Sequence, residues 1–167
     1  MAINYDNIKD EESLVKEAVA LLKKKVFGKK FNLTVQSQND IYNYALTKID
    51  KRYEIVLVFY LNAKNKIVAE TRHVGTIAQS LFYPREMARI AFETGALGII
   101  VCHNHPSGDK NPSEVDIKTT EKLVKGFSFL DLQVLDHLVI GENGFYSFFQ
   151  EGKIEIWRKE IQGISFK

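Results

Sequence analysis

Apolar residues along this chain recur with two different periods, one typical of strands and one typical of helices. Residues 54–61 are nearly all apolar and β-prone, which predicts a strand covered on both faces. In 84–94 the apolar residues instead share one helical stripe behind a leading Pro84, which predicts a helix. In full, the predicted strands are 31–35, 54–61, 66–71, 99–105, 133–140 and 145–148, and the predicted helices are 11–26, 37–46, 84–94 and 113–124.

The order of these elements predicts an α/β fold with one mixed β-sheet flanked by helices. Helices are interleaved with strands, and the polar turn at 62–65 makes one strand pair a hairpin. We divide the chain into an N-terminal helical extension at 1–30, a main domain at 31–150 and a C-terminal tail at 151–167. The apolar stripe of the extension is expected to pack on the domain or on a partner chain. The tail contains the only tryptophan, and its pattern predicts no element.

Composition excludes several classes of protein. A hydrophobic fraction of 45% with only three prolines indicates a packed core rather than a disordered chain. The formal net charge of +2 offers no concentrated basic face for nucleic acid. The lysine run at 23–25 could touch nucleic acid, but it also suits a solvated helix end. A single cysteine, a polar start and the lack of any apolar run near ~18 residues lead us to expect a cytoplasmic protein without membrane contact.

The strongest chemical signal follows the strand expected at 99–105. His103 and His105 are two residues apart, so a strand points both imidazoles to the same side. A loop broken by prolines and a glycine then leads to Ser113 and Asp116 in the first turn of a helix. Two imidazoles and one carboxylate with an open fourth position form the ligand set of a catalytic zinc site. The alternatives are two ordinary strand-end histidines and a purely structural S-x-x-D helix cap, although Ser113 can serve both roles.

Hydrolysis at such a site requires a base that is not itself a ligand. Glu54 is our candidate, because it stands at the head of an apolar strand where an acid has no reason to pack. Glu86 competes with it, but carboxylates are common in the first turn of a helix because of the helix dipole.

Three other residues are candidates with simpler explanations. Cys102 faces away from both neighbouring histidines on a strand, so we expect a small buried hydrophobe. The dipeptide Asp136-His137 is either a pair behind the metal ligands, a pH-sensitive contact, or a buried histidine with its hydrogen bonds satisfied. His73 is expected at the surface.

These motifs resemble those of a known family. His103-x-His105, seven residues and then Ser113-x-x-Asp116 match the JAMM pattern of MPN-domain metalloproteases. The fuller string HNHPSGDKNPSEVD, followed by VLDHLVIG at 134–141, resembles the bacterial RadC family over about residues 34–148. The resemblance implies a cytidine-deaminase-like (JAB/MPN) fold and a zinc ion held by the two histidines and Asp116. It also implies that Ser113 lies near the oxyanion and that an upstream glutamate, here Glu54, is the base.

The chain departs from the RadC pattern at two points. Lys110 stands where RadC proteins commonly have proline, and the helix-hairpin-helix segment usual at their N-terminus is missing from this sequence. Our first hypothesis is a zinc metallohydrolase acting on a peptide or isopeptide bond of a protein substrate. The second is a DNA repair or recombination accessory that binds nucleic acid or a repair partner. The third is an inactive MPN-like scaffold, a class that typically loses metal ligands. The oligomeric state stays open.

Overall fold

The computed structural model describes residues 13–17, 33–75 and 84–162. The chain divides into two compact units, Met1–Lys30 and Phe31–Lys167. In the first unit, residues 13–17 are helical, and the rest of the helix predicted at 11–26 lies outside the described residues.

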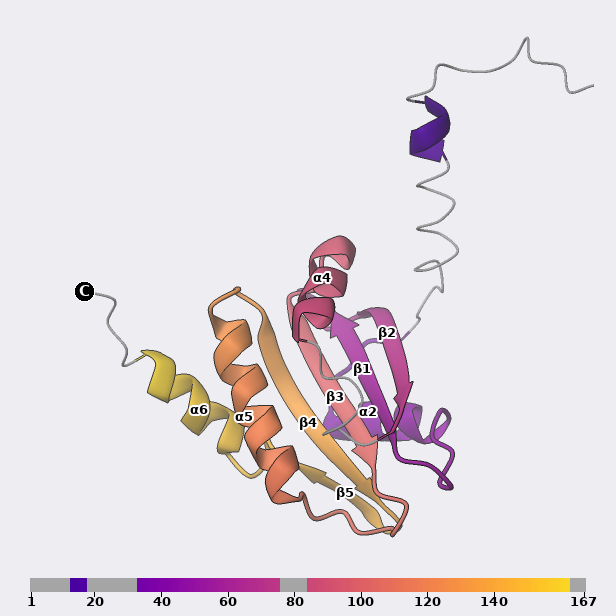
Figure 1. Cartoon of the computed structure of the whole chain (residues 1–167), viewed down its shortest axis with the longest axis vertical. Coiled ribbons are helices and arrows are strands. Elements are labelled where there is room, and N and C mark those ends of the chain that lie inside the picture. Colours follow the sequence, from indigo (N-terminus) through magenta and orange to yellow (C-terminus); the bar gives the residue numbers. More distant parts are fainter. Residues whose placement is uncertain (1–12, 18–32, 76–83, 163–167) are drawn as a thin grey trace, which may run out of the picture. The chain divides into compact units, whose positions relative to one another are not determined.

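The second unit is built on one five-stranded mixed sheet with the strand order β2-β1-β3-β4-β5 (Figure 1). β1 pairs antiparallel with β2 and with β3, β3 pairs parallel with β4, and β4 pairs antiparallel with β5. This arrangement confirms the predicted α/β class with a mixed sheet. The strand expected at 31–35 is reduced to an isolated bridge between Thr34 and Lys66 in its described part. The strands are β1 (Ile55–Leu61), β2 (Ile67–Val74), β3 (Gly98–Asn104), β4 (Gln133–Gly141) and β5 (Gly144–Ser147).

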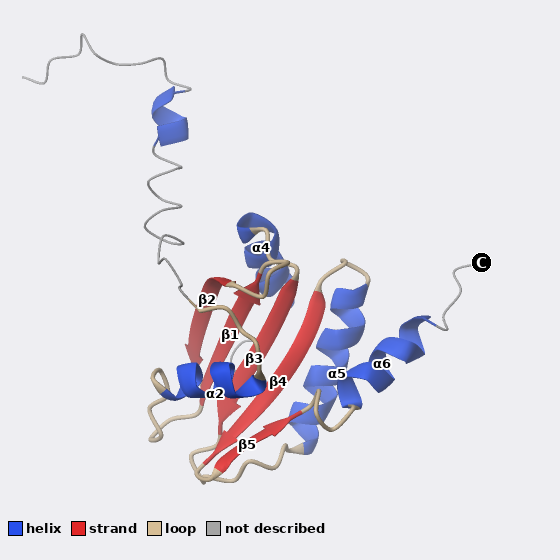
Figure 2. Ribbon diagram, turned by 180° about the vertical axis from the view of Figure 1, so that it is seen from behind, coloured by secondary structure: helices blue, strands red, loops and turns tan. Residues whose placement is uncertain are grey.

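Helices cover both faces of this sheet. α2 (Gln38–Leu46) lies across one face, and α4 (Pro84–Thr94) and α5 (Glu114–Ser128) lie on the other (Figures 1 and 2). β1 is buried at every residue, because its two sets of alternating side chains each meet a helical layer. The face under α2 collects the main apolar cluster, which includes Cys102 with no exposed area, as predicted. No helix within the described ranges combines the length and apolarity needed to cross a membrane.

The C-terminal segment, for which the sequence predicted no element, contains a further helix, α6 (Lys153–Gln162). Its buried side carries Ile154, with no exposed area, and Trp157, which is 7% exposed. The ring centroids of Trp157 and Phe148 are 6.0 Å apart. Arg158 Nη2 donates to the backbone oxygen of Val134 at 2.7 Å, so α6 is tied to the start of β4. The main domain therefore extends into the tail.

Candidate metal centre

The two histidines of the H-x-H motif meet at the carboxyl end of β3. His103, the penultimate residue of the strand, is fully buried, and the His105 side chain is 19% exposed. Their Nε2 atoms are 3.0 Å apart. The period of two in a strand has therefore brought both rings to one side, as the sequence predicted.

The helix that follows brings Asp116 to the same place. Ser113 is the N-cap of α5, and its Oγ accepts a hydrogen bond from the Asp116 backbone N–H at 3.2 Å. In return, the Ser113 backbone N–H and hydroxyl both donate to Asp116 Oδ2, at 2.6 and 2.7 Å. This reciprocal capping box fixes the aspartate rotamer. Asp116 Oδ1 then lies 3.4 Å from His103 Nε2, and Oδ2 lies 3.4 Å from His105 Nε2.

The separations among these three groups suit a tetrahedral divalent ion. Metal–ligand bonds of about 2.0–2.1 Å at tetrahedral angles place neighbouring ligand atoms about 3.3 Å apart. The two Nε2 atoms are 3.0 Å apart, and each lies 3.4 Å from a different oxygen of Asp116, Oδ1 for His103 and Oδ2 for His105. One ligand atom from each residue can be chosen within 4.8 Å of the others, and no other such group of His, Cys, Asp or Glu occurs in the described ranges. The donor set of two imidazole nitrogens and one carboxylate oxygen leaves one corner for water or substrate.

Charge at the site is already arranged for a cation. Burial by itself raises the pKa of the Asp116 carboxyl, but hydrogen bonds from His103 and His105 outweigh it and hold that pKa well below its usual range. The hydrogen bond to Asp116 raises the pKa of His105, with burial opposing it. Asp116 is therefore a carboxylate at neutral pH.

Strand register brings Glu54 to the same face. Val56 of β1 is the partner of His103, so two further steps, just beyond the last pair of the ladder, place Glu54 opposite His105. Directly opposed residues of an antiparallel pair point to the same side of the sheet. The negative charge of Glu54 also contributes to the raised pKa of His105.

The backbone around Glu54 is held by Asn104, the residue between the two histidines. Asn104 is 3% exposed, and its Oδ1 accepts a hydrogen bond from the Ile55 N–H at 3.0 Å. Its Nδ2 donates to the backbone oxygen of Tyr53 at 3.0 Å. On the far side, the Gly75 N–H donates to the backbone oxygen of Glu54 at 2.8 Å. The main chain on either side of Glu54 is thus anchored to both neighbouring strands.

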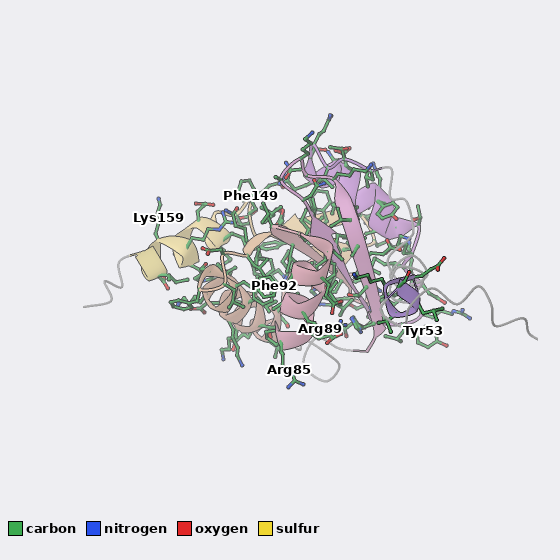
Figure 3. The ribbon with its side chains drawn as sticks, turned by 90° about the horizontal axis from the view of Figure 1, so that it is seen from above. Tyr53, Arg85, Arg89, Phe92, Phe149 and Lys159 are labelled. Carbon is green, nitrogen blue, oxygen red and sulfur yellow. The ribbon has the colours of Figure 1, made fainter. Side chains whose placement is uncertain are left out.

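The competing carboxylate is engaged elsewhere. Glu86, in the first turn of α4, is half exposed and forms an ion pair with Arg89, which lies on the same helix (Figure 3). This pair holds the pKa of Glu86 below its usual value, chiefly through the hydrogen bond from Arg89. A surface ion pair of this kind explains the residue without a catalytic role.

The side chains of Asp136 and His137 point to opposite faces of the sheet. Asp136 accepts hydrogen bonds from the Ser147 hydroxyl at 2.6 Å and from the Phe149 N–H at 3.0 Å. His137, which is 1% exposed, points the other way and places its Nε2 2.8 Å from His103 Nδ1. Of the predicted pair, only the histidine touches a candidate ligand.

Two smaller observations complete the site. Thr120, which no sequence motif singled out, lies with its Oγ1 2.6 Å from His137 Nδ1. His73, expected at the surface, is half-buried in β2, and burial lowers its pKa.

Two pockets in the described part of the chain differ in whether their lining includes a histidine of the cluster. A pocket of about 300 Å³ lies on the α2 side, with Ile41 and Leu138 in its lining. A second pocket of about 170 Å³ includes His105 and Asn104, with Lys51 and Glu142 also in its lining. Of the three candidate ligands, the smaller pocket includes only His105 in its lining.

Together, the mixed sheet and the His-His-Asp cluster at its strand end define an α/β protein of the JAB-domain class. Residues 35–154 match the family described as RadC-like JAB domain, and the chain belongs to that family.

Curated relatives agree with this assignment. The chain is 39% identical over 124 residues to UPF0758 protein CT0611 of Chlorobaculum tepidum, an alignment that covers 73% of this chain and 56% of the relative. It is 35% identical over 149 residues to UPF0758 protein SH1266 of Staphylococcus haemolyticus, covering 87% of this chain and 65% of the relative. It is 40% identical over 129 residues to UPF0758 protein TTE0897 of Caldanaerobacter subterraneus, covering 70% and 54%. The chain therefore spans less than two thirds of these relatives.

Proposed function

We propose that this protein is a zinc-dependent metallohydrolase that cleaves a peptide or isopeptide amide bond in a protein substrate. The observation that carries the proposal is the convergence of His103, His105 and Asp116, whose nearest side-chain atoms are 3.0–3.4 Å apart, with Glu54 in register beside them. Imidazole and carboxylate ligands suit zinc, and three protein ligands with an open corner are typical of a catalytic rather than a structural site.

Each residue has a distinct role in this reaction. A zinc ion held by the three ligands would polarise the scissile carbonyl and lower the pKa of a bound water to about 7. Glu54 takes the proton from the attacking water and passes it to the leaving amine. The anchored backbone around Glu54 supports this role, because a general base must reach its proton within hydrogen-bond distance.

Ser113 supports the developing oxyanion. Its hydroxyl donates to Asp116 Oδ2, and it can rotate toward the substrate because the Ser113 backbone N–H still donates to the same oxygen. One such donor at an oxyanion is worth about 2.7–4 kcal/mol in other hydrolases.

The test combines metal analysis with cleavage of a peptide library, with and without a chelator. Wild-type protein should bind one zinc per chain and lose activity on chelation. Glu54→Gln should keep the metal and lose turnover, whereas His103→Ala or Asp116→Ala should lose the metal. Unchanged hydrolysis by Glu54→Gln would overturn the assignment of the base, and wild-type protein that fails to bind a divalent ion would overturn the proposal as a whole.

A DNA repair or recombination accessory remains the second candidate. The net charge of +2 gives it little electrostatic support. Salt-dependent binding in a DNA shift assay by protein that lacks hydrolytic activity would favour it over the first.

A further inference from the structure

We infer that His137 and Thr120 are positioning residues for the metal centre: they form a hydrogen-bond relay that holds His103 with its Nε2 lone pair aimed at the ion. The inference rests on the proposed metal site, and it assigns the role to two residues outside the ligand set. The chain of contacts runs from the backbone of α5 through β4 to the end of β3.

The donor and acceptor of each hydrogen bond in the relay follow from the first bond, between Thr120 and the backbone of Asp116. Thr120 Oγ1 lies 2.5 Å from the backbone oxygen of Asp116. A carbonyl oxygen can only accept, so the single hydroxyl proton of Thr120 points at it. Thr120 Oγ1 also lies 2.6 Å from His137 Nδ1, and because its proton is already used it must accept there. His137 therefore carries its proton on Nδ1.

The second half of the relay fixes His103. A neutral His137 with its proton on Nδ1 has a lone pair on Nε2, which lies 2.8 Å from His103 Nδ1. His103 must donate this hydrogen bond from Nδ1, so in the neutral ring that a metal ion binds, Nε2 carries no proton. That nitrogen is the one 3.0 Å from His105 Nε2 and 3.4 Å from Asp116 Oδ1. A neutral imidazole in this tautomer is what a metal ion requires of its ligand.

The surroundings hold the ring of His137 in place. His137 is 1% exposed. Its ring stacks on Phe148 with an interplanar angle of 8° and a centroid distance of 5.0 Å. Packing against Phe148 thus fixes the plane of the His137 ring, and the relay fixes which of its nitrogens donates and which accepts.

His105 is oriented by a different device. Its Nδ1 lies 2.9 Å from the backbone oxygen of Asp109, which again makes Nδ1 a donor, so the neutral ring that binds a metal ion presents Nε2. Both ligating imidazoles therefore present the same atom to the ion. Only the support of His103 consists of side chains, so it can be removed one group at a time.

The relay also contacts the backbone of Asp116, the third candidate ligand. Thr120 lies one turn after Asp116 on α5, and the carbonyl it binds belongs to Asp116 itself. The first turn of the helix and the end of β3 are thus joined through β4, behind the ligands. Removal of this link should loosen the separation between His103 and Asp116, in addition to freeing the His103 tautomer.

Four variants separate a positioning role from simple packing. His137→Phe keeps an aromatic ring on Phe148 but has no acceptor, whereas His137→Gln places an amide oxygen near the lost Nε2. Thr120→Val keeps the shape of the side chain without the hydroxyl, whereas Thr120→Ser keeps the hydroxyl. For each variant, zinc affinity is measured by competition with a chelator, and unfolding is followed thermally. Histidine tautomers are read by ¹⁵N NMR on metal-free wild-type protein.

In the wild type, NMR should show both His103 and His137 protonated on Nδ1. His137→Phe and Thr120→Val should weaken zinc binding by about 10–100-fold, the usual effect of losing a partner behind a metal ligand, and the matched variants should recover most of it. A His103 without a proton on Nδ1 would overturn the inference, as would folded His137→Phe or Thr120→Val protein that binds zinc like the wild type. Should those variants fail to fold, the wild-type tautomers decide the question.

The outcome is separable from the proposed function. Wild-type protein that binds zinc but cleaves nothing would remove the hydrolase and leave the relay intact, because affinity and tautomer are measured without turnover.

Discussion

Replacement of Gly141 by alanine should damage the metal centre from a distance. Gly141 ends β4, and the loop between His105 and Ser113 crosses directly over it. A Cβ added at Gly141 would lie 2.6 Å from the backbone oxygen of Gly108 and 2.8 Å from the backbone nitrogen of Lys110. Such contacts essentially never fall below 3.0 Å, and both of these neighbours are main-chain atoms that cannot rotate aside.

The size of the disturbance can be worked from these distances. The loop must retreat by about 0.4 Å, the difference between 3.0 and 2.6 Å, and by about 0.8 Å to reach an ordinary contact at 3.4 Å. Asp109 lies within the displaced stretch, and its backbone oxygen is 2.9 Å from His105 Nδ1. A shift of that size along the bond would lengthen it to about 3.3–3.7 Å, beyond the usual range of hydrogen bonds. We expect a stability loss of about 1–3 kcal/mol and a zinc affinity reduced roughly tenfold or more.

The matched control is Gly126→Ala. Gly126 lies on the exposed side of α5, and a Cβ there meets nothing within 4 Å. Helix propensity predicts a gain of up to about 1 kcal/mol and no change in zinc affinity. Urea unfolding and chelator competition measure both quantities for both variants. Gly141→Ala protein with wild-type stability and zinc affinity would refute the reasoning.

Three further outcomes are expected. Asn104→Leu removes both side-chain hydrogen bonds that anchor the chain beside Glu54, so hydrolysis should fall while zinc content is unchanged. Equal loss of hydrolysis and zinc would mean that Asn104 supports the metal ligands instead of Glu54. Trp157→Ala should cost about 3–5 kcal/mol in urea unfolding, and an unaltered midpoint would show that α6 is not docked. Hydrogen bonds from Arg52 lower the pKa of Asp50 from 3.8 to about 2, so their small stabilisation is present above pH 3.8 and is lost as the pH falls toward 2. Asp50→Asn should remove that part of the acid dependence of thermal unfolding; an identical profile would contradict the assignment.

The local sequence pattern predicts an element correctly where consecutive residues are all apolar, as in a strand that is buried on both faces. β1 was predictable because every residue of the strand is apolar and buried. α5 runs four residues beyond its predicted end at Val124, since Phe127 continues the buried stripe and the exposed Gly126 does not break the helix. α6 was not predictable, because Ile154 and Trp157 make a recognisable stripe only once Phe148 and α5 are in place to receive them.

The same limit applies to the candidate site. His103, His105 and Asp116 could be grouped because a period of two and a helix cap are local features of fourteen consecutive residues. The contact between His103 and His137 depends on the register of the parallel pair β3–β4, which shifts between Ile99 and Ile100. No local signal encodes such a register, so the histidine was visible in the sequence but its partner was not.

The capping box at the start of α5 links ion binding to the order of the helix. Asp116 Oδ2 is bound by the Ser113 N–H and hydroxyl, while Oδ1 faces His103, so one carboxylate serves the helix terminus and the ion at once. Amide hydrogen exchange should therefore detect whether an ion occupies the site. The amides of Asp116 and Ser113 will exchange more slowly when an ion is bound, and they will report its release even in a variant with no catalytic activity.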